Sequence, residues 1–143
     1  MSKEQYVTFE VAKLLKEKGF DWFTYSYYTK DDVDKKPYFG IETLCPDNWN
    51  GEVDEVNDLW FSAPTQQMAC RWLIEEKNIY VTAVPDIGNS LRFYPAIYVI
   101  KGEIPEEYWF EYINSVVEEL NKSYSEPQQA VDAALQYVLK NLI

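Results

Sequence analysis

The chain has 143 residues, a formal net charge of -11 at pH 7 and no histidine. The missing histidine excludes Ser-His-Asp and Cys-His catalysis, histidine-ligated zinc and pH switching by imidazole. The negative charge disfavours direct binding to nucleic-acid phosphates or to anionic membranes, and we expect neither.

The length is typical of one domain, so residues 1–143 are predicted to form a single globular domain. No apolar run approaches the roughly 18 residues that cross a membrane, and the N-terminus lacks the apolar core of a signal peptide. The two cysteines, Cys45 and Cys70, are too few for a thiolate zinc site. We expect a cytoplasmic protein with reduced thiols, and the sequence leaves a disulfide between them open.

Tyrosine is frequent, with 12 residues in an aromatic share of 17%. A tyrosine can bury its ring while its hydroxyl reaches a polar partner, which suits both sheet faces and interfaces. The composition therefore favours a tyrosine-rich sheet and leaves a recognition surface as the alternative.

The first predicted element is a helix over residues 7–18. Thr8 can cap its N-terminus, and apolar residues follow at helical spacing. Gly19 stands where a left-handed residue ends a helix, and Phe20 can fold back onto Leu15, as in a Schellman ending.

Two strands are predicted next, over residues 23–28 and 38–44, because aromatic and β-branched residues are frequent in both segments. The charged segment KDDVDKKP between them predicts a hairpin-like unit. Residues 46–58 are predicted to form a solvated loop, and the stretch 42–58 holds six carboxylates and no Lys or Arg. The surroundings of Gly51 do not match a calcium-binding loop, and a weak cation site is the alternative.

The stretch SAPTQQMACRWLIEEKNIYV spans residues 62–81 and has the clearest pattern in the chain. A short strand is predicted at 59–63, a helix at 64–77 and a strand at 79–84. Proline is accepted in the first turn of a helix because its missing N–H has no helical partner there. We expect Ser62 or Thr65 to cap this helix.

This middle helix has one apolar stripe and one polar face. The stripe is predicted to be buried and consists of Met68, Ala69, Trp72 and Leu73. The polar face supplies the candidate interaction residues Gln66, Gln67 and Arg71, for which no packing role is evident. Cys70 is predicted to be a semi-buried, unreactive thiol because no histidine can serve as its base, and Cys45 is predicted to be similar.

Turn residues at Gly88 and Asn89 precede a strand predicted over 91–100. Pro95 cannot donate to a ladder of hydrogen bonds, so it predicts an edge position or a bulge. Residues 103–121 are predicted to be helical from their apolar spacing, although their aromatic composition also suits a strand.

The last predicted element is a helix over residues 126–141. Ser125 and Gln128 match the capping-box pattern, and apolar residues line one side of the helix. Helices do not alternate regularly with strands along the chain. The order therefore predicts an α+β fold with a mostly antiparallel sheet and about three or four packed helices.

Three segments of the chain resemble segments of one protein group: VTFEVAKLLKEKGF, SAPTQQMACRWLIEEKNIYV and YSEPQQAVDAALQYVLKNLI. The group consists of small uncharacterised proteins from Bacteroides-type gut bacteria, often encoded by prophages or other mobile elements. In the group the middle segment is similar to A-P-T-Q-x-x-A-x-x-W-L followed by a strand. This chain departs from the group at its last helix, where Ser125, Glu126 and Pro127 replace an acidic start. The resemblance implies a mobile-element context and an unassigned function, and it supplies no catalytic residues.

No P-loop, Rossmann glycine pattern, nucleophile elbow or metalloprotease motif is present, so no cofactor, metal or catalytic residue is assigned. We expect a non-catalytic protein that acts through contact with an unknown protein partner. Two alternatives stay open. In the first, the chain is an acidic mimic of nucleic acid that inhibits a host nucleic-acid-binding enzyme. In the second, it is a small enzyme with an unrecognised, histidine-free site. The sequence assigns neither a partner nor an oligomeric state.

Overall fold

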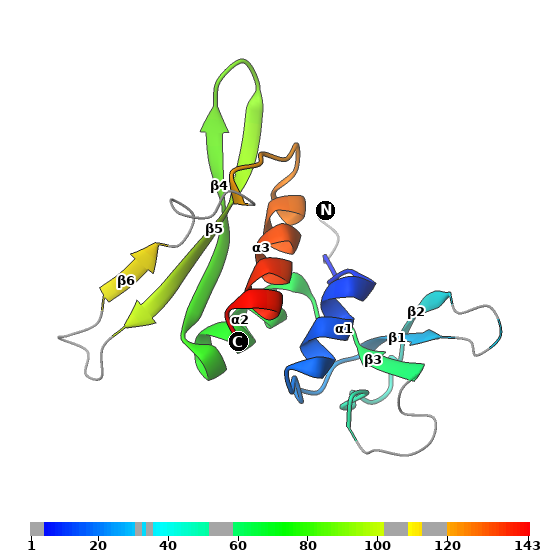
Figure 1. Ribbon diagram of the computed structural model, residues 1–143. Helices are drawn as coiled ribbons and strands as arrows, with labels where there is room; N and C mark the ends of the chain where they lie inside the picture. The colour runs from blue at the N-terminus through cyan, green and yellow to red at the C-terminus, as the bar shows by residue number, and fades with distance from the viewer. Residues whose placement is uncertain (1–4, 31–32, 34–35, 52–58, 102–108, 113–119) are drawn as a thin grey trace. The chain divides into compact units, whose positions relative to one another are not determined.

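The computed structural model describes residues 5–30, 33, 36–51, 59–101, 109–112 and 120–143. These residues form three helices and two antiparallel sheets, which confirms the predicted α+β class (Figure 1). Each sheet has three strands, in the orders β2-β1-β3 and β4-β5-β6. The elements in chain order are α1 (Phe9–Glu17), β1 (Ser26–Lys30), β2 (Pro37–Ile41), β3 (Trp60–Ser62), α2 (Gln66–Lys77), β4 (Ile79–Ile87), β5 (Leu91–Lys101), β6 (Trp109–Tyr112) and α3 (Pro127–Asn141).

The chain divides into two compact units, Met1–Thr65 and Gln66–Ile143. The first unit holds α1 and the sheet β2-β1-β3, and the second holds α2, α3 and the sheet β4-β5-β6. The expectation of one domain over residues 1–143 stays a prediction. None of the helices in the described ranges is long and apolar enough to cross a membrane.

Helix α1 begins and ends as its sequence predicts. The Thr8 hydroxyl oxygen accepts a hydrogen bond from the Val11 amide at 3.4 Å. Gly19 has a φ of 88°, and the Phe20 amide donates to the Leu15 carbonyl at 3.0 Å. The left-handed Gly19 and this hydrogen bond form the predicted Schellman ending. The helix is two residues shorter than predicted at its start, where the Val7 amide instead donates to the Pro64 carbonyl.

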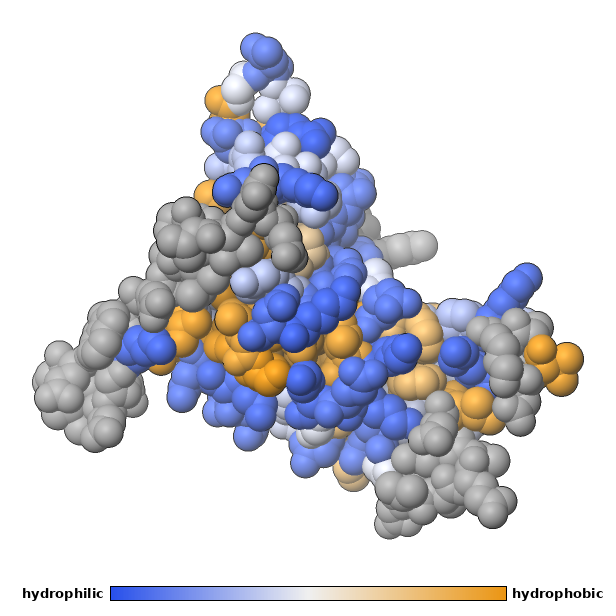
Figure 2. Space-filling view, viewed as in Figure 1, coloured by the Kyte–Doolittle hydropathy of each residue, from blue (hydrophilic) through white to orange (hydrophobic). Residues whose placement is uncertain are grey.

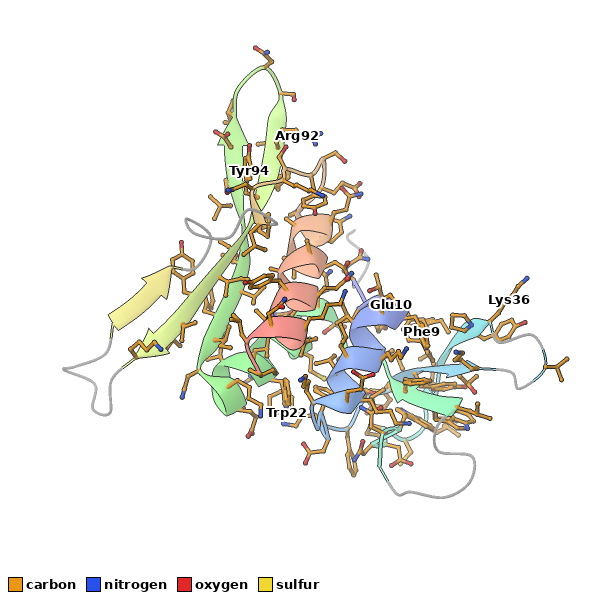
Figure 3. All side chains as sticks on the ribbon, viewed as in Figure 1. Phe9, Glu10, Trp22, Lys36, Arg92 and Tyr94 are labelled. Atoms are coloured by element: carbon orange, nitrogen blue, oxygen red, sulfur yellow. The ribbon has the colours of Figure 1, made fainter. Side chains whose placement is uncertain are left out.

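The first sheet contains the predicted hairpin, in which β1 is the central strand and β2 an edge strand. Strands β1 and β2 pair antiparallel, with Tyr27 opposite Gly40, and β3 pairs with the other edge of β1. Helix α1 packs against one face of this sheet. The Phe9 ring lies 5.6 Å from that of Tyr28 and 5.1 Å from that of Phe61, edge to face in both pairs (Figure 3).

In the second unit, α2 and α3 pack on the sheet β4-β5-β6. Val81 and Ile97 are buried and stand opposite each other in the register of β4 and β5. The buried residues of α3 include Ala134 and Leu135, and the small alanine side chain allows close approach to the sheet. Trp72 is 2% exposed, so its predicted place in the core is confirmed.

Pro95 lies opposite Ala83 on β4, in the middle of the long strand β5. In the described residues, β5 pairs with β6 over residues 98–101, and Phe93 exchanges two backbone hydrogen bonds with Tyr124. Peptide groups alternate between the two sides of a strand, so the Pro95 nitrogen faces the same side as that of Phe93, away from β4, and removes no donor from the β4–β5 ladder. The predicted edge position or bulge is wrong, because β5 is the central strand of its sheet and its register with β4 is continuous through Pro95.

The predicted helix over residues 103–121 is wrong at its centre. Residues 109–112 form β6, which pairs antiparallel with residues 98–101 of β5. Aromatic residues favour a strand where a neighbouring edge can pair with them, and that pairing outweighs the helical spacing. Residues 102–108 and 113–119 lie outside the described part of the chain.

The predicted capping box of the last helix is also wrong. Helix α3 begins at Pro127 with Glu126 as its N-cap, and no side chain caps it. Ser125 stands one residue too early, and its hydroxyl lies 3.2 Å from the Gln129 side-chain oxygen. Gln128 instead donates to the Glu126 carboxylate at 2.8 Å. A shift of one residue in the helix start therefore separates the two partners that the box requires.

Candidate functional site

The three candidate residues from the sequence do not converge on one point. Gln66 donates to the Gln128 backbone oxygen at 2.9 Å, so it joins the start of α2 to the start of α3. Gln66 therefore does have a packing role, which the sequence did not show. Gln67 is exposed, and Arg71 lies on the exposed face in an ion pair with Glu75 at 3.3 Å. The proposed interaction role of these residues stays a prediction.

The two cysteines are free, so no disulfide joins them. Burial raises the pKa of the Cys70 thiol from 9.0 to about 11, which agrees with the unreactive thiol predicted there. Cys45 was expected to be similar but is exposed, because it belongs to a surface segment after β2. In the described ranges, no three His, Cys, Asp or Glu side chains gather as a metal site. With its raised pKa, the buried Cys70 thiol is protonated at neutral pH.

The arrangement with the most chemical content lies on the first sheet, on the face opposite α1. Residues that stand opposite one another in paired strands share a face. Tyr28 and Phe61 contact Phe9 of α1, so their neighbours in β1 and β3 point to the other side. We call this other side the outer aromatic face, and its aromatic residues are Tyr25, Tyr27, Tyr38, Trp49 and Trp60.

Tyr27 is at the centre of this face. Its ring lies 4.7 Å from that of Trp49 and 5.0 Å from that of Trp60, between ring centroids. The two indole rings are stacked on each other at 5.7 Å and an interplanar angle of 19°. Tyr27 also covers Gly40 so closely that a Cβ there would lie 2.5 Å from its ring. A glycine on β2 thus makes room for the central ring.

Trp49 reaches the sheet from a loop, and hydrogen bonds hold it in place. Its amide donates to the Ser62 hydroxyl at 3.0 Å, and its indole N–H donates to the Thr24 carbonyl at 2.9 Å. Asn50 accepts from the Ser62 amide at 2.9 Å and donates to the Phe20 carbonyl at 3.0 Å. These bonds connect the loop to β3 and to the segment between α1 and β1. The Trp49 ring is therefore held against the sheet by the protein's own hydrogen bonds.

The outer aromatic face remains accessible to water. Tyr25 is 53% exposed and Tyr38 is 50% exposed, while Tyr27, Trp49 and Trp60 are half-buried. Exposed Tyr and Trp rings that are held rigidly are typical of binding surfaces, because little conformational entropy is lost on association.

A carboxylate lies beside the Tyr25 end of this face. The Glu42 amide donates to the Tyr25 carbonyl at 2.7 Å, which places Glu42 opposite Tyr25 and on the same face. Asp47 is exposed but pairs with Thr24, whose side chain points to the other face from that of Tyr25. The end of the face is thus both aromatic and acidic.

Hydropathy colouring gives a separate view of the protein surface. On the side viewed in Figure 2, hydrophilic residues dominate and hydrophobic residues occupy smaller patches. Tyrosine and tryptophan lie near the middle of the hydropathy scale. A hydropathy map therefore does not mark the outer aromatic face as a hydrophobic patch, although its rings offer a large contact area.

Sequence reasoning only partly anticipated this face. Its signal was the alternation in TYSYYT, where small Thr24 and Ser26 are buried and the tyrosines between and after them are not. The predicted solvated loop at 46–58 hid the contribution of Trp49. A tryptophan in a polar segment was the available signal, but its partners lie far away in the chain.

Comparison of the chain with family models, curated proteins and solved structures gave no match.

Proposed function

We propose that this chain is a non-catalytic cytoplasmic protein that binds a protein partner through the outer aromatic face. The supporting observation is the rigid cluster of Tyr27, Trp49 and Trp60, flanked by the exposed rings of Tyr25 and Tyr38. Tyr and Trp dominate the binding energy of protein interfaces because they bury much area with few rotatable bonds.

The geometry favours an interface over a merely structural cluster. A structural cluster needs its rings buried, yet two of the five aromatic residues keep half of their surface exposed. Trp49 uses its indole N–H inward, toward Thr24, so its outward surface offers ring area without a competing donor. The resemblance to mobile-element proteins is compatible with such a role and stays a proposal.

The two alternatives have less support. The nucleic-acid mimic depends on acids at 42–58 and 103–119, and most of these residues lie outside the described part of the chain. The small enzyme needs a perturbed carboxylate or thiol in a pocket. Cys70 has a raised pKa, which keeps it protonated and unreactive at neutral pH.

Site-specific photo-crosslinking tests the proposal. A benzophenone amino acid is placed at Tyr25 or, as the matched control, at Tyr80 in the second sheet, in cells of the organism that encodes the chain. Tyr80 is 42% exposed, close to the 53% of Tyr25, so both probes reach solvent equally well. We expect an adduct of defined mass from the probe at position 25 and none of that mass from position 80.

A competition step separates specific contact from chance capture. Excess purified wild-type chain should abolish the adduct, while a chain with Tyr25→Ser and Tyr38→Ser should compete poorly. An adduct of equal yield from both probe positions, or equal competition by the double variant, would contradict the proposed function.

A further inference from the structure

We infer that the outer aromatic face binds a segment of its partner that carries arginine side chains. This inference rests on the proposed function and specifies the chemistry of the partner. It follows from three features of the first unit: where its own cations lie, where its Glu42 carboxylate lies, and how its rings are arranged.

Two lysines of the first unit already contact aromatic rings on the opposite side of the sheet. Lys16 lies 4.7 Å above the Phe61 ring and Lys30 lies 5.6 Å from the Phe9 ring. Lys13 and Lys18 belong to α1 or its end, which packs on that same side. The sheet thus shows cation–π contacts on its α1 face, where its own lysines supply the cations.

The Tyr25 end of the outer aromatic face has the same kind of rings but an acidic neighbour. In the described ranges, no lysine or arginine side chain lies over the ring of Tyr25, Tyr27, Trp49 or Trp60. Lys36 precedes β2 at the far end of the strand from Glu42, and Figure 3 shows its side chain extending from that end. The first arginine in the chain, Arg71, belongs to the second unit.

One carboxylate completes the complementarity. Glu42 stands opposite Tyr25 in the register of β1 and β2, so the two side chains share the outer aromatic face. The Glu42 carboxylate accepts one backbone amide, from Leu44, and retains further acceptor capacity. A cation on the rings at this end therefore has a charge partner close by. The four acids at 52–58 are not needed for this complementarity.

Arginine fits this surface better than lysine does. A guanidinium is planar, weakly hydrated and able to stack on an aromatic ring while it donates to a carboxylate. A lysine ammonium must give up a tighter hydration shell for the same contact. The exposed ring of Tyr25 beside Glu42 offers this combination of a stacking plane and an acceptor.

Fluorescence anisotropy with labelled synthetic peptides tests the inference on the full-length chain. The probes are peptides of alternating serine with arginine, lysine or citrulline, which keeps the shape of arginine without its charge. We expect the arginine peptide to bind most tightly, the lysine peptide more weakly, and the citrulline peptide not measurably. Tyr25→Leu should weaken arginine-peptide binding about 3- to 30-fold, the range of a cation–π contact.

Matched variants separate the face from general attraction to an acidic protein. Tyr80→Leu makes the same change on an exposed tyrosine of the second sheet and should leave the affinity within about 2-fold. Glu42→Gln should weaken binding and reduce its dependence on salt. Because Tyr25 is half exposed, its variant should fold, and an unchanged circular dichroism spectrum with an unchanged Tm verifies that it does.

Equal arginine-peptide affinities for wild type, Tyr25→Leu and Tyr80→Leu would overturn the inference, because binding would then follow net charge alone. Binding of the citrulline peptide as tight as that of the arginine peptide would overturn it as well. If either result occurs while the probe at position 25 still gives its specific crosslinked adduct, the proposed function stands and the partner has a different chemistry. If the probe at position 25 gives no specific adduct, the proposed function itself is contradicted.

Discussion

The two sheets of this chain share their strand number and their helix packing on one face, but they differ on the opposite face. Each has three antiparallel strands and at least one helix against one face. In the first sheet, the other face gathers Tyr27, Trp49 and Trp60 within 5.7 Å of one another. In the second sheet, the rings of Tyr80 and Tyr98 lie 6.2 Å apart across β4 and β5.

The cause of the difference is local. Gly40 leaves space that lets Tyr27 lie flat across β2, and the loop after β2 brings Trp49 onto the rings. On the second sheet, the Arg92 guanidinium on β5 donates hydrogen bonds to the hydroxyl and the backbone carbonyl of Ser123, both at 3.0 Å. The Arg92 side chain, labelled in Figure 3, is thereby joined to the segment before α3. A single fold plan thus yields one face with an open aromatic cluster, which we propose binds a partner, and one whose arginine is engaged in the protein's own hydrogen bonds.

The largest expected effects concern the helices that cover the two sheets. Leu15→Ala in α1 and Leu135→Ala in α3 each remove a side chain that is 0% exposed. Each variant should lower the free energy of unfolding by about 2–5 kcal/mol in urea denaturation. Leu44→Ala, at a residue that is 91% exposed, is the control and should change it by less than about 0.5 kcal/mol. A loss below about 1 kcal/mol at Leu15 or Leu135 would show that the site is not part of a packed core.

The next effect compares the two thiols. Because burial raises the pKa of Cys70 to about 11, its reactive thiolate should be about 100-fold scarcer at pH 8 than that of an ordinary cysteine. Iodoacetamide should therefore modify the exposed Cys45 first, as mass spectrometry of timed samples can show. Preferential labelling of Cys70 in the native chain would contradict its burial.

The same shift gives a sign for stability against pH. Between the unfolded pKa of 9.0 and the folded pKa of about 11, the native state holds the Cys70 proton more tightly than the unfolded state does. The contribution of Cys70 is fully present below pH 9 and is lost as pH rises toward 11. Cys70→Ser should flatten this part of the stability profile, and an unchanged slope would refute the assignment.

A smaller effect tests how the outer aromatic face is built. Gly40→Ala places a Cβ 2.5 Å from the Tyr27 ring, so the ring must move. Overpacking of this kind should lower the free energy of unfolding by about 1–3 kcal/mol and alter the tryptophan emission. Gly88→Ala, where no atom lies within 4 Å, should change neither. Identical behaviour of the two variants would mean that Tyr27 does not lie over β2.

The smallest effect compares two helix starts. Thr8→Ala removes a side-chain cap from α1 and should lower the free energy of unfolding by about 1 kcal/mol. Ser125→Ala removes no cap bond from α3 and should lower it by less than about 0.5 kcal/mol. Equal losses in thermal denaturation would indicate that Ser125 does cap α3 in solution.

Local chemistry explains what the sequence could predict. Thr8 and Gly19 act within one turn of α1, and Trp72 belongs to a stripe set by helical spacing, so each followed from nearby residues. The capping box of α3 failed because a shift of one residue cannot be read from the pattern alone. Strand β6 depends on the partner edge of β5, which the sequence does not reveal.

The sequence predicted only the aromatic composition of the outer aromatic face, not which residues form it. The abundance of tyrosine suggested a recognition surface, but the assembly of the face depends on bonds between distant residues. Trp49 donates to Thr24 and Ser62, and Tyr27 needs Gly40 on the next strand. Gln66 is the opposite case: the sequence suggested no structural role for it, but its side-chain amide donates to the Gln128 backbone carbonyl.

Amide hydrogen exchange of the full chain, alone and with the partner captured at position 25, tests the central claim most directly. We predict slower exchange on binding at residues 25–29, 38–42 and 47–50, which carry the outer aromatic face, and unchanged exchange at 79–84. Protection confined to 79–98 on the second sheet, with none on the first, would contradict the assignment of the outer aromatic face as the binding surface.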